Sequence, residues 1–366
     1  MTAAIRFFRG LNFLLLCIPV SLVLNSVPRM NPLWVFLTAA LAIIPLAGLM
    51  GQATEELAKH LGATWGGLLN ATFGNAAELI IGLSALHAGA HLVPLVQASI
   101  VGSILGNILL VLGASIMAGG LRYKLQTFNQ DQAESQSINL LLAALSLSVP
   151  AIFVAAYSHR AAPSPVAIER LSLSVAGVLL VVYLASLWFS LRTHQDLFRA
   201  CGAEDVDQDE PPLWNKRTAV GALALATVFV AVESEVLVKS VEGAAHALGL
   251  NNVFIGIIVL AIIGNNAEQS TAIWMAMKNK MDITMNIAIG SSIQIAMFVA
   301  PLLVFASVLM GHPMTFVFSI PEMTAIGFSV LIAAFIAGDG KCHWLEGAQL
   351  LAAYLLIALA FFFLPP

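Results

Sequence analysis

Long apolar stretches follow one another along almost the entire chain, and short polar connections separate them. Each stretch has about the 17 to 25 residues that an α-helix needs to cross the hydrocarbon core of a membrane. None has the alternating pattern of roughly ten-residue strands that is typical of an outer-membrane barrel. The pattern predicts an all-α polytopic membrane protein with eleven transmembrane helices, at residues 11–27, 33–50, 64–87, 93–118, 136–157, 166–191, 218–241, 253–277, 283–310, 315–337 and 345–364.

The composition supports this fold class. Hydrophobic residues make up 59% of the 366 residues and charged residues only 10%, whereas a soluble domain has about 25% charged residues. The net charge of −4 comes without a basic tract, so no nucleic-acid partner is expected. Cys17, Cys201 and Cys342 have neither metal-binding nor redox spacing, and we expect no cofactor.

The positive charges are distributed unevenly between alternate connections. If the N-terminus is cytoplasmic, twelve of the 16 Lys and Arg residues fall on the inner side, and four fall on the outer side: Arg29, Arg160, Arg170 and Lys239. Cytoplasmic loops of membrane proteins carry an excess of Lys and Arg. We therefore expect a cytoplasmic N-terminus and a C-terminus outside.

The first helix and the longest polar connection each allow two interpretations. Arg6 and Arg9 precede the first helix as in a secretory signal, but no small-x-small cleavage site comes before Pro28, which favours a retained helix. The acidic connection at residues 192–216 is either a solvated linker between two halves or a cation-collecting or regulatory element at the cytoplasmic mouth. It lacks the ligand spacing of an EF-hand loop.

A five-residue pattern occurs twice, each time in the middle of an apolar stretch. It reads Gly-Asn-Ala-Ala-Glu at residues 74–78 and Gly-Asn-Asn-Ala-Glu at residues 264–268. A Gly-Ser pair follows each glutamate, after 24 residues in the first half and 22 in the second. A carboxylate near the centre of a membrane costs several kcal/mol and usually has a function. The chain therefore has an internal repeat that carries one functional acid in each copy, Glu78 and Glu268.

The two copies lie five predicted helices apart. Because five is odd, the two signature helices enter the membrane from opposite faces. Such inverted repeats place the binding site of many secondary transporters near the midplane, between the halves. This topology predicts that Glu78 and Glu268 meet at one site.

The chemistry of the two motifs indicates a hard cation. Asn75 and Glu78 share a helix face, as do Asn265 and Glu268. Gly74 and Gly264 allow local bending, which frees backbone carbonyl oxygens as further ligands. All these ligands are oxygens, as Ca²⁺ prefers, and two carboxylates match the charge of a divalent ion. Further candidates for the site are Ser103, Ser291 and Gln294.

Accessory roles in the pathway are predicted for a second set of residues: Asn107, Ser292, Asn266, Gln269, Glu235 and Glu242. Glu235 and Glu242 are seven residues apart, so they share a helix face and suit an access path. The alternatives are an interfacial ion pair between Glu242 and Lys239, and simple helix packing for the Ser and Asn side chains.

Two neighbouring carboxylates also explain exchange. Without the cation they repel each other and are poorly solvated, and both effects favour the binding of protons. Ca²⁺ and H⁺ then compete for one site as the cavity opens to each side in turn. A purely structural role, with both glutamates neutral and hydrogen-bonded, and an intramembrane enzyme are the alternatives from other classes. No His-rich metal motif, Ser/Lys pair or phosphate-binding loop supports an enzyme.

These motifs resemble the two alpha-repeats of Ca²⁺/H⁺ antiporters in the cation/calcium exchanger superfamily. The resemblance runs from about residue 33 to the end, and it is carried by residues 74–80, 102–107, 264–268 and 290–295 and by the C-terminal segments 339–340 and 344–349. It implies one extra N-terminal helix (1–32), two inverted five-helix repeats (33–191 and 217–366) and an acidic linker between them. It also implies that Glu78 and Glu268 bind Ca²⁺ and H⁺.

One departure from the family pattern lies beside the second glutamate. The family's second repeat usually reads Ala before Glu-His, whereas here Asn266 precedes the glutamate and Gln269 follows it. The alternative within the superfamily is a Na⁺/Ca²⁺ exchanger. The long N-terminal tail of vacuolar plant and fungal members is not seen, so we expect a prokaryotic plasma-membrane protein. We expect it to contact lipid, and a homo-oligomer is compatible with the sequence.

Overall fold

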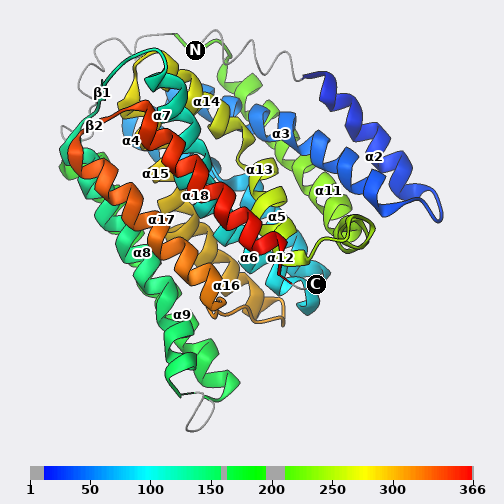
Figure 1. Ribbon diagram of the computed structural model, residues 1–366. Coiled ribbons are helices and arrows are strands. Elements are labelled where there is room, and N and C mark those ends of the chain that lie inside the picture. The colour runs from blue at the N-terminus through cyan, green and yellow to red at the C-terminus, as the bar shows by residue number, and fades with distance from the viewer. Residues whose placement is uncertain (1–11, 158–162, 195–210, 365–366) are drawn as a thin grey trace.

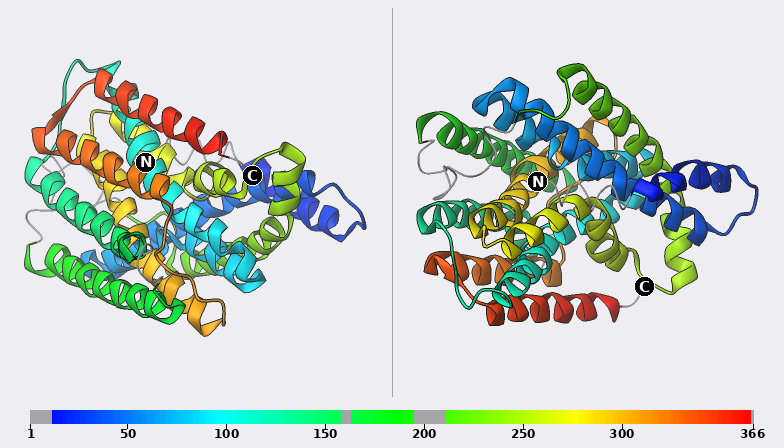
Figure 2. Two further views of the ribbon diagram at one scale, coloured as in Figure 1. Left: turned by 60° about the horizontal axis from the view of Figure 1, so that its bottom comes forward. Right: turned by 90° about the horizontal axis from the view of Figure 1, so that it is seen from above.

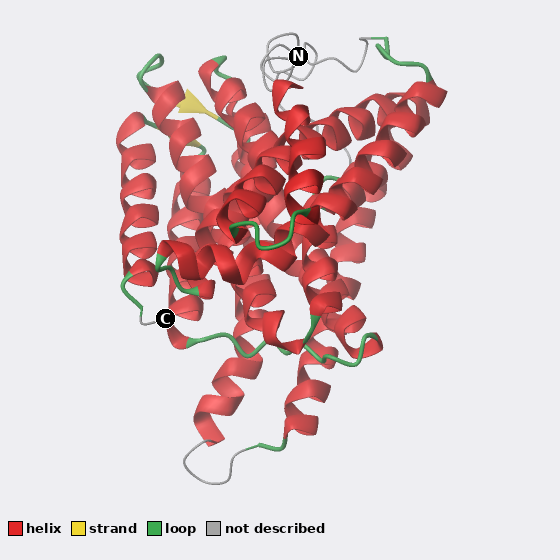
Figure 3. Cartoon of the chain, turned by 90° about the vertical axis from the view of Figure 1, so that its right-hand side faces the viewer, coloured by secondary structure: helices red, strands yellow, loops and turns green. Residues whose placement is uncertain are grey.

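The computed structural model describes residues 12–157, 163–194 and 211–364, and this part of the chain is almost entirely helical (Figures 1 and 3). The predicted acidic linker lies mostly outside the described residues. The first half contains η1 (Asn12–Leu16), α2 (Cys17–Ser26), α3 (Pro32–Leu61), α4 (Ala63–Phe73), α5 (Ala76–Ala88), η2 (Ala90–Leu92), α6 (Val93–Leu105), η3 (Gly106–Val111), α7 (Leu112–Gly120), α8 (Gln130–Tyr157), α9 (Pro165–Trp188) and η4 (Phe189–Thr193).

The second half repeats this succession of elements. It contains α11 (Lys216–Leu248), α12 (Asn252–Phe254), η6 (Ile255–Leu260), α13 (Ala261–Gly264), α14 (Asn266–Met277), α15 (Met281–Gln294), η7 (Ile295–Val299), α16 (Ala300–Leu309), α17 (Ile320–Asp339) and α18 (Trp344–Phe362). Strands β1 (Gln126–Thr127) and β2 (Lys341–Cys342) form a small antiparallel pair.

Each of the eleven predicted stretches contains a helix, and the chain is a membrane protein. Among the described residues, eight helices are long and apolar enough to cross a membrane, or nine if the bent pair around Gly264 counts as one span. The other two stretches form the shorter apolar helices Asn12–Ser26 and Ala76–Ala88. The prediction of an all-α polytopic fold is confirmed.

Two helix boundaries differ from the sequence prediction for identifiable reasons. The second helix does not end near residue 50. It continues to Leu61, because Glu56 is buried there and binds both Lys59 Nζ (3.0 Å) and the backbone N–H of Trp214 (3.0 Å). The tenth helix begins at Ile320 rather than at 315, because Ser319 and Glu322 form a reciprocal capping box.

Several contacts gather alternate loops at one end of the bundle. The carboxylate of Glu56, near the end of α3, accepts a hydrogen bond from the N–H of Trp214, before α11. The side chain of Gln126, after α7, binds Asn279, between α14 and α15 (3.1 Å). Strand β1 also pairs with β2, which precedes α18. We call this end the hairpin end.

Two further contacts lie at the far end. Gln97 near the start of α6 donates to the carbonyl of Thr315 before α17 (2.7 Å), and Asn251 before α12 donates to the carbonyl of Phe361 in α18 (3.0 Å). Consequently α4–α5 runs from the hairpin end to the far end, whereas α12–α14 runs from the far end to the hairpin end. The two signature helices have opposite directions, as the sequence predicted.

The signature helices are surrounded by the rest of the bundle. The segment Ala90–Gly120 is 83% buried over its apolar window, whereas α18 is 22% buried and lies at the surface. Helix α11 packs along α3 and contacts α5, and α2 packs on α3 and α11 at the periphery. Figure 2 shows α2 at the edge of the bundle in both views.

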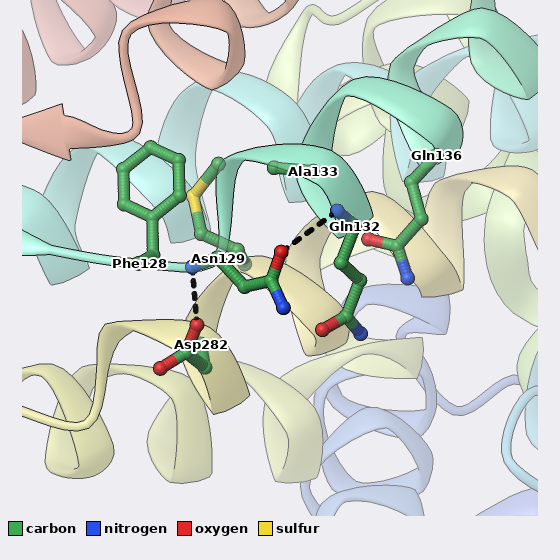
Figure 4. Close-up of a pocket in the computed structure, with 7 residues that line it drawn as sticks. Phe128, Asn129, Gln132, Ala133, Gln136 and Asp282 are labelled. Carbon is green, nitrogen blue, oxygen red and sulfur yellow. Dashed lines mark hydrogen bonds between the residues drawn. The ribbon is translucent and has the colours of Figure 1, made fainter. Parts of the chain in front are cut away.

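A polar cluster holds α8 and α15 together near the hairpin end (Figure 4). The Asp282 carboxylate accepts a hydrogen bond from the backbone N–H of Asn129 (2.6 Å), and Asn129 Oδ1 accepts one from the N–H of Gln132 (3.0 Å). The cluster thus caps the N-terminus of α8 and ties it to α15, which carries part of the predicted site.

Replacement of Asp282 tests this connection. We expect Asp282→Ala to destabilise the protein by about 1.5–3 kcal/mol, the usual contribution of a hydrogen bond to a charged group, seen as a lower melting temperature in detergent. Asp282→Asn keeps an acceptor oxygen for the N–H of Asn129 and should lose less. Equal melting temperatures for the alanine variant and the unmodified protein would contradict this role of Asp282.

Candidate cation site between the two broken helices

Each repeated motif is a break between two helices. Helix α4 ends at Phe73 and α5 begins at Ala76, while α13 ends at Gly264 and α14 begins at Asn266. The second pair is bent by 64°. Glycine and asparagine tolerate such breaks better than bulky residues do. The prediction of local bending is confirmed at Gly264, and at Gly74 the structure shows an interruption between two helices.

The breaks place the two glutamates at helix N-termini. Glu78 lies in the first turn of α5 and Glu268 in the first turn of α14. The N–H groups and the positive end of the helix dipole stabilise negative charge there. On the other side of each break, Asn70 O at the end of α4 accepts from the N–H of Gly74 (2.8 Å), and Ala261 O in α13 accepts from the N–H of Asn265 (3.2 Å). Each break therefore places a carboxylate directly after the end of another helix.

The two copies meet by a reciprocal crossing. A Cβ atom placed on Gly264 would lie 3.1 Å from Glu78 Oε1, and one placed on Gly74 would lie 3.5 Å from Glu268 Oε1. Each glutamate therefore rests against the glycine of the other copy. A Cβ on Gly264 would crowd the Glu78 carboxylate, whereas a Cβ on Gly74 would make an ordinary van der Waals contact with Glu268, so the fit is tighter at Gly264.

One hydrogen bond also joins the two copies, from Asn75 Nδ2 to Gln294 Oε1 (2.5 Å). A second hydrogen bond lies within the second copy, where Ser291 Oγ donates to Glu268 Oε2. Asn75 and Asn265 are nearly inaccessible, with 2% and 1% of their surface exposed. The structure thus brings together Asn75, Glu268, Ser291 and Gln294, in addition to the two glycines and Glu78.

Several buried oxygens at this place have no hydrogen-bond donor in the described part of the chain. They are Oδ1 of Asn75, Oε2 of Glu78, Oδ1 of Asn265 and Oδ1 of Asn266. A buried acceptor without a partner is unfavourable, whereas such oxygens are the ligands that a hard cation prefers. The described residues include no group of three or more His, Cys, Asp or Glu side chains that could hold a metal ion. A cation here would thus be held by two carboxylates and neutral oxygens.

Three of the remaining predicted residues of the central helices are buried and Gln269 is half-buried, and their contacts differ. Ser103 on α6 is 2% exposed and Asn107 on η3 is 1% exposed, and Asn107 Nδ2 has no acceptor among the described residues. The hydroxyl of Ser292 donates to Ala288 O in its own helix (2.9 Å). Gln269 Nε2 has no described acceptor. These contacts place Ser292 in helix packing and leave the amides of Asn107 and Gln269 unsatisfied.

The structure does not bring Glu235 and Glu242 to the two breaks. Glu235 is exposed and binds Lys239 Nζ (2.6 Å), and Glu242 is exposed 3.9 Å from His91 Nε2. The alternative ion pair of Lys239 with Glu242 is wrong, because Lys239 bonds to Glu235 four residues earlier instead. The shared helix face was correct, but that face is at the surface of the protein.

Sequence reasoning missed the π-helical segments beside the site. Segment η3 contains Asn107, η6 directly precedes α13, and η7 directly follows Gln294. A π-helical segment shifts the side chains that follow it around the helix axis and is frequent at functional sites. No hydrophobic period marks these segments, because they lie within continuous apolar runs.

Comparison with known proteins identifies relatives over the full chain. A family model described as sodium/calcium exchanger protein matches residues 31–192 and 218–363. The chain is 46% identical to a Ca(2+)/H(+) antiporter of Aphanothece halophytica, over 96% of both sequences. It is 42% identical to the Ca(2+)/H(+) antiporter ChaA of Bacillus subtilis (strain 168), over 95% of this chain and 97% of that protein. The solved structure of native YfkE superposes with a TM-score of 0.82 at 38% identity, covering 98% of this chain and 100% of that chain.

The crossing of Glu78 over Gly264 can be tested with one methyl group. We expect Gly264→Ala to displace the Glu78 carboxylate and to weaken Ca²⁺ binding by about tenfold, since overpacking costs about 1–3 kcal/mol. Isothermal titration of the purified protein with Ca²⁺ measures the change. Gly177→Ala is the matched control, because a Cβ there meets no atom within 4 Å. Unchanged binding in Gly264→Ala would contradict the crossing.

The hydrogen bond from Ser291 makes the two copies unequal. Ser291→Ala removes the donor to Glu268 Oε2, so we expect Ca²⁺ affinity to fall about tenfold or more, since a hydrogen bond to a charged group contributes about 1.5–3 kcal/mol. Ser103 has no described hydrogen bond to Glu78, so Ser103→Ala should have a smaller effect. Equal losses in the two variants would show that the bond does not matter.

Proposed function

The chain belongs to the sodium/calcium exchanger protein family, and on that premise we propose that it exchanges Ca²⁺ for H⁺ across a membrane. It is a secondary transporter and not an enzyme. The observation that carries the proposal is the reciprocal crossing of Glu78 and Glu268 over Gly264 and Gly74, with unpaired oxygens around both carboxylates. The relatives named as Ca(2+)/H(+) antiporters support the choice of both ions.

The charge of the site explains why two ions compete for it. Ca²⁺ bound between Glu78 and Glu268 neutralises two negative charges. When Ca²⁺ leaves, two carboxylates remain close together in a medium of low dielectric constant, where like charges repel strongly and favour protonation. Protons on the carboxylates remove that repulsion and also remove the ligand charge. The site therefore binds either Ca²⁺ or protons, which is the basis of obligatory exchange.

The opposite directions of the two broken helices suit alternating access. Helix α5 leads from the break toward the far end, and α14 leads from the break toward the hairpin end. Rocking of one half against the other can then open the same pair of carboxylates to either side. Asn75 and Gln294 join the halves by a hydrogen bond at this place and would follow such a movement.

The orientation and environment follow from the surface of the bundle. The hairpin end carries many of the positive residues, including Lys59, Arg122, Lys124, Lys278 and Lys341, and Arg122 bonds there to the carbonyl of Met277 (3.4 Å). We assign this end to the cytoplasm and the protein to a prokaryotic plasma membrane, which is consistent with a relative from a bacterium. The exposed apolar faces of α8, α9 and α18 suit contact with lipid. A homo-oligomer stays a prediction.

Flux in proteoliposomes tests the exchange. We expect an imposed pH gradient to drive Ca²⁺ uptake, and expect Glu78→Gln or Glu268→Gln to lower its rate by about a hundredfold or more, since removing one buried charged partner costs about 3–5 kcal/mol. Glu134→Gln is the matched control, because Glu134 is an exposed carboxylate on α8.

Two results would contradict the proposal. The first is pH-driven Ca²⁺ uptake at the normal rate in either glutamine variant. The second is uptake that follows a sodium gradient and ignores a pH gradient, which would identify a Na⁺/Ca²⁺ exchanger instead. Competition by other divalent cations in the same assay defines the selectivity.

A further inference from the structure

One buried acid lies outside the cation site. Glu233 on α11 has no exposed surface, and neither has Ser21 on α2, which it contacts. Ser21 Oγ lies 2.8 Å from Glu233 Oε1 and 2.7 Å from Oε2. The exchange mechanism above makes no use of this carboxyl group, although buried ionisable residues in membrane helices usually have a function.

The number of hydrogen atoms available at this contact bears on the protonation state of Glu233. Ser21 Oγ also lies 2.8 Å from the carbonyl oxygen of Ile18. A hydroxyl group has one hydrogen, so an ionised Glu233 would leave this hydrogen to be shared among three acceptor oxygens. If Glu233 carries a proton, its O–H donates to Ser21 Oγ and the Ser21 O–H donates to Ile18 O. The protonated acid thus supplies a second hydrogen, and both hydrogens have an acceptor.

The surroundings supply no positive charge in the described part of the chain. From α2, the titratable group near Glu233 is Cys17, one turn before Ser21. Helix α3 has no titratable residue between Pro32 and Thr54. Helices α5 and α11 carry further titratable groups, but these contact other residues. On α5, Glu78 faces Gly264 and His87 lies near Glu235. On α11, Glu235 binds Lys239.

We propose that Glu233 is a second proton-binding site, apart from Glu78 and Glu268, and that its protonated form fastens α2 to α11. A buried carboxylate without a counter-charge is strongly unfavourable, so loss of this proton would destabilise the buried packing of α2 on α11 around Ser21 and Glu233. Helix α11 packs on α3 and α5, and α5 carries Glu78. The contact therefore links the proton concentration to the helices around the cation site.

Infrared spectroscopy detects this proton directly. A protonated carboxylic acid has a carbonyl band that is separate from the bands of a carboxylate. In the background Glu78→Gln with Glu268→Gln, which removes both acids of the cation site, we expect one such band to persist at neutral pH. Adding Glu233→Gln should remove it, whereas adding Glu134→Gln should not. A spectrum that Glu233→Gln leaves unchanged at neutral pH would overturn the proposal.

A second measurement covers a Glu233→Gln variant that does not fold. Ser21→Ala removes the acceptor for the Glu233 O–H, so the acid band should shift in frequency while staying present, and an unshifted band would overturn the proposal. In addition, the melting temperature of unmodified protein should fall at alkaline pH more than that of Glu233→Gln, whose amide stays neutral. An equal decrease in melting temperature for both proteins would contradict a proton on Glu233. Neither measurement depends on transport, so each can fail while the proposed exchange stands.

Discussion

The interruption of two membrane helices at their centres is the constraint on which the rest of the structure depends. A continuous helix uses its own carbonyl oxygens, so it can offer a buried ion only side chains. The breaks at Gly74 and Gly264 begin a new helix at the centre and place a carboxylate in its first turn. Such breaks would be unfavourable in lipid, so other parts of the protein must surround them. The buried segment Ala90–Gly120 is part of this surrounding protein.

The inverted arrangement follows from the same requirement. Two acids can meet at one depth only if both breaks lie halfway across, and a reciprocal contact forms when the helices run in opposite directions. The glycines then serve twice, because each allows its own helix to bend and admits the glutamate of the other copy. Contacts at the ends, such as that of Glu56 with Trp214 and that of Asp282 with Asn129, fix the loops while leaving the centre free of interlocking ion pairs.

The fold and the central acids could be predicted from sequence because both rest on strong energetic penalties. Apolar length defines the helices, and a carboxylate in such a run is rare enough to mark a site. Periodicity failed for Glu235 and Glu242, because it states that two residues share a face and not what that face contacts. The contact of Ser21 with Glu233 joins residues 212 positions apart in the chain. No local sequence pattern predicts such a pair, and none predicts the π-helical segments.

The two halves of the site are not equivalent, although the motif is repeated. In the first copy the positions that correspond to Asn266 and Gln269 are Ala76 and Leu79, so only the second copy adds two amides beside its glutamate. Glu268 also accepts a hydrogen bond from Ser291, whereas Oε2 of Glu78 has no described donor. The departure from the family pattern therefore lies on the half that is already more polar, and the proton and the cation meet two different carboxyl groups at one site.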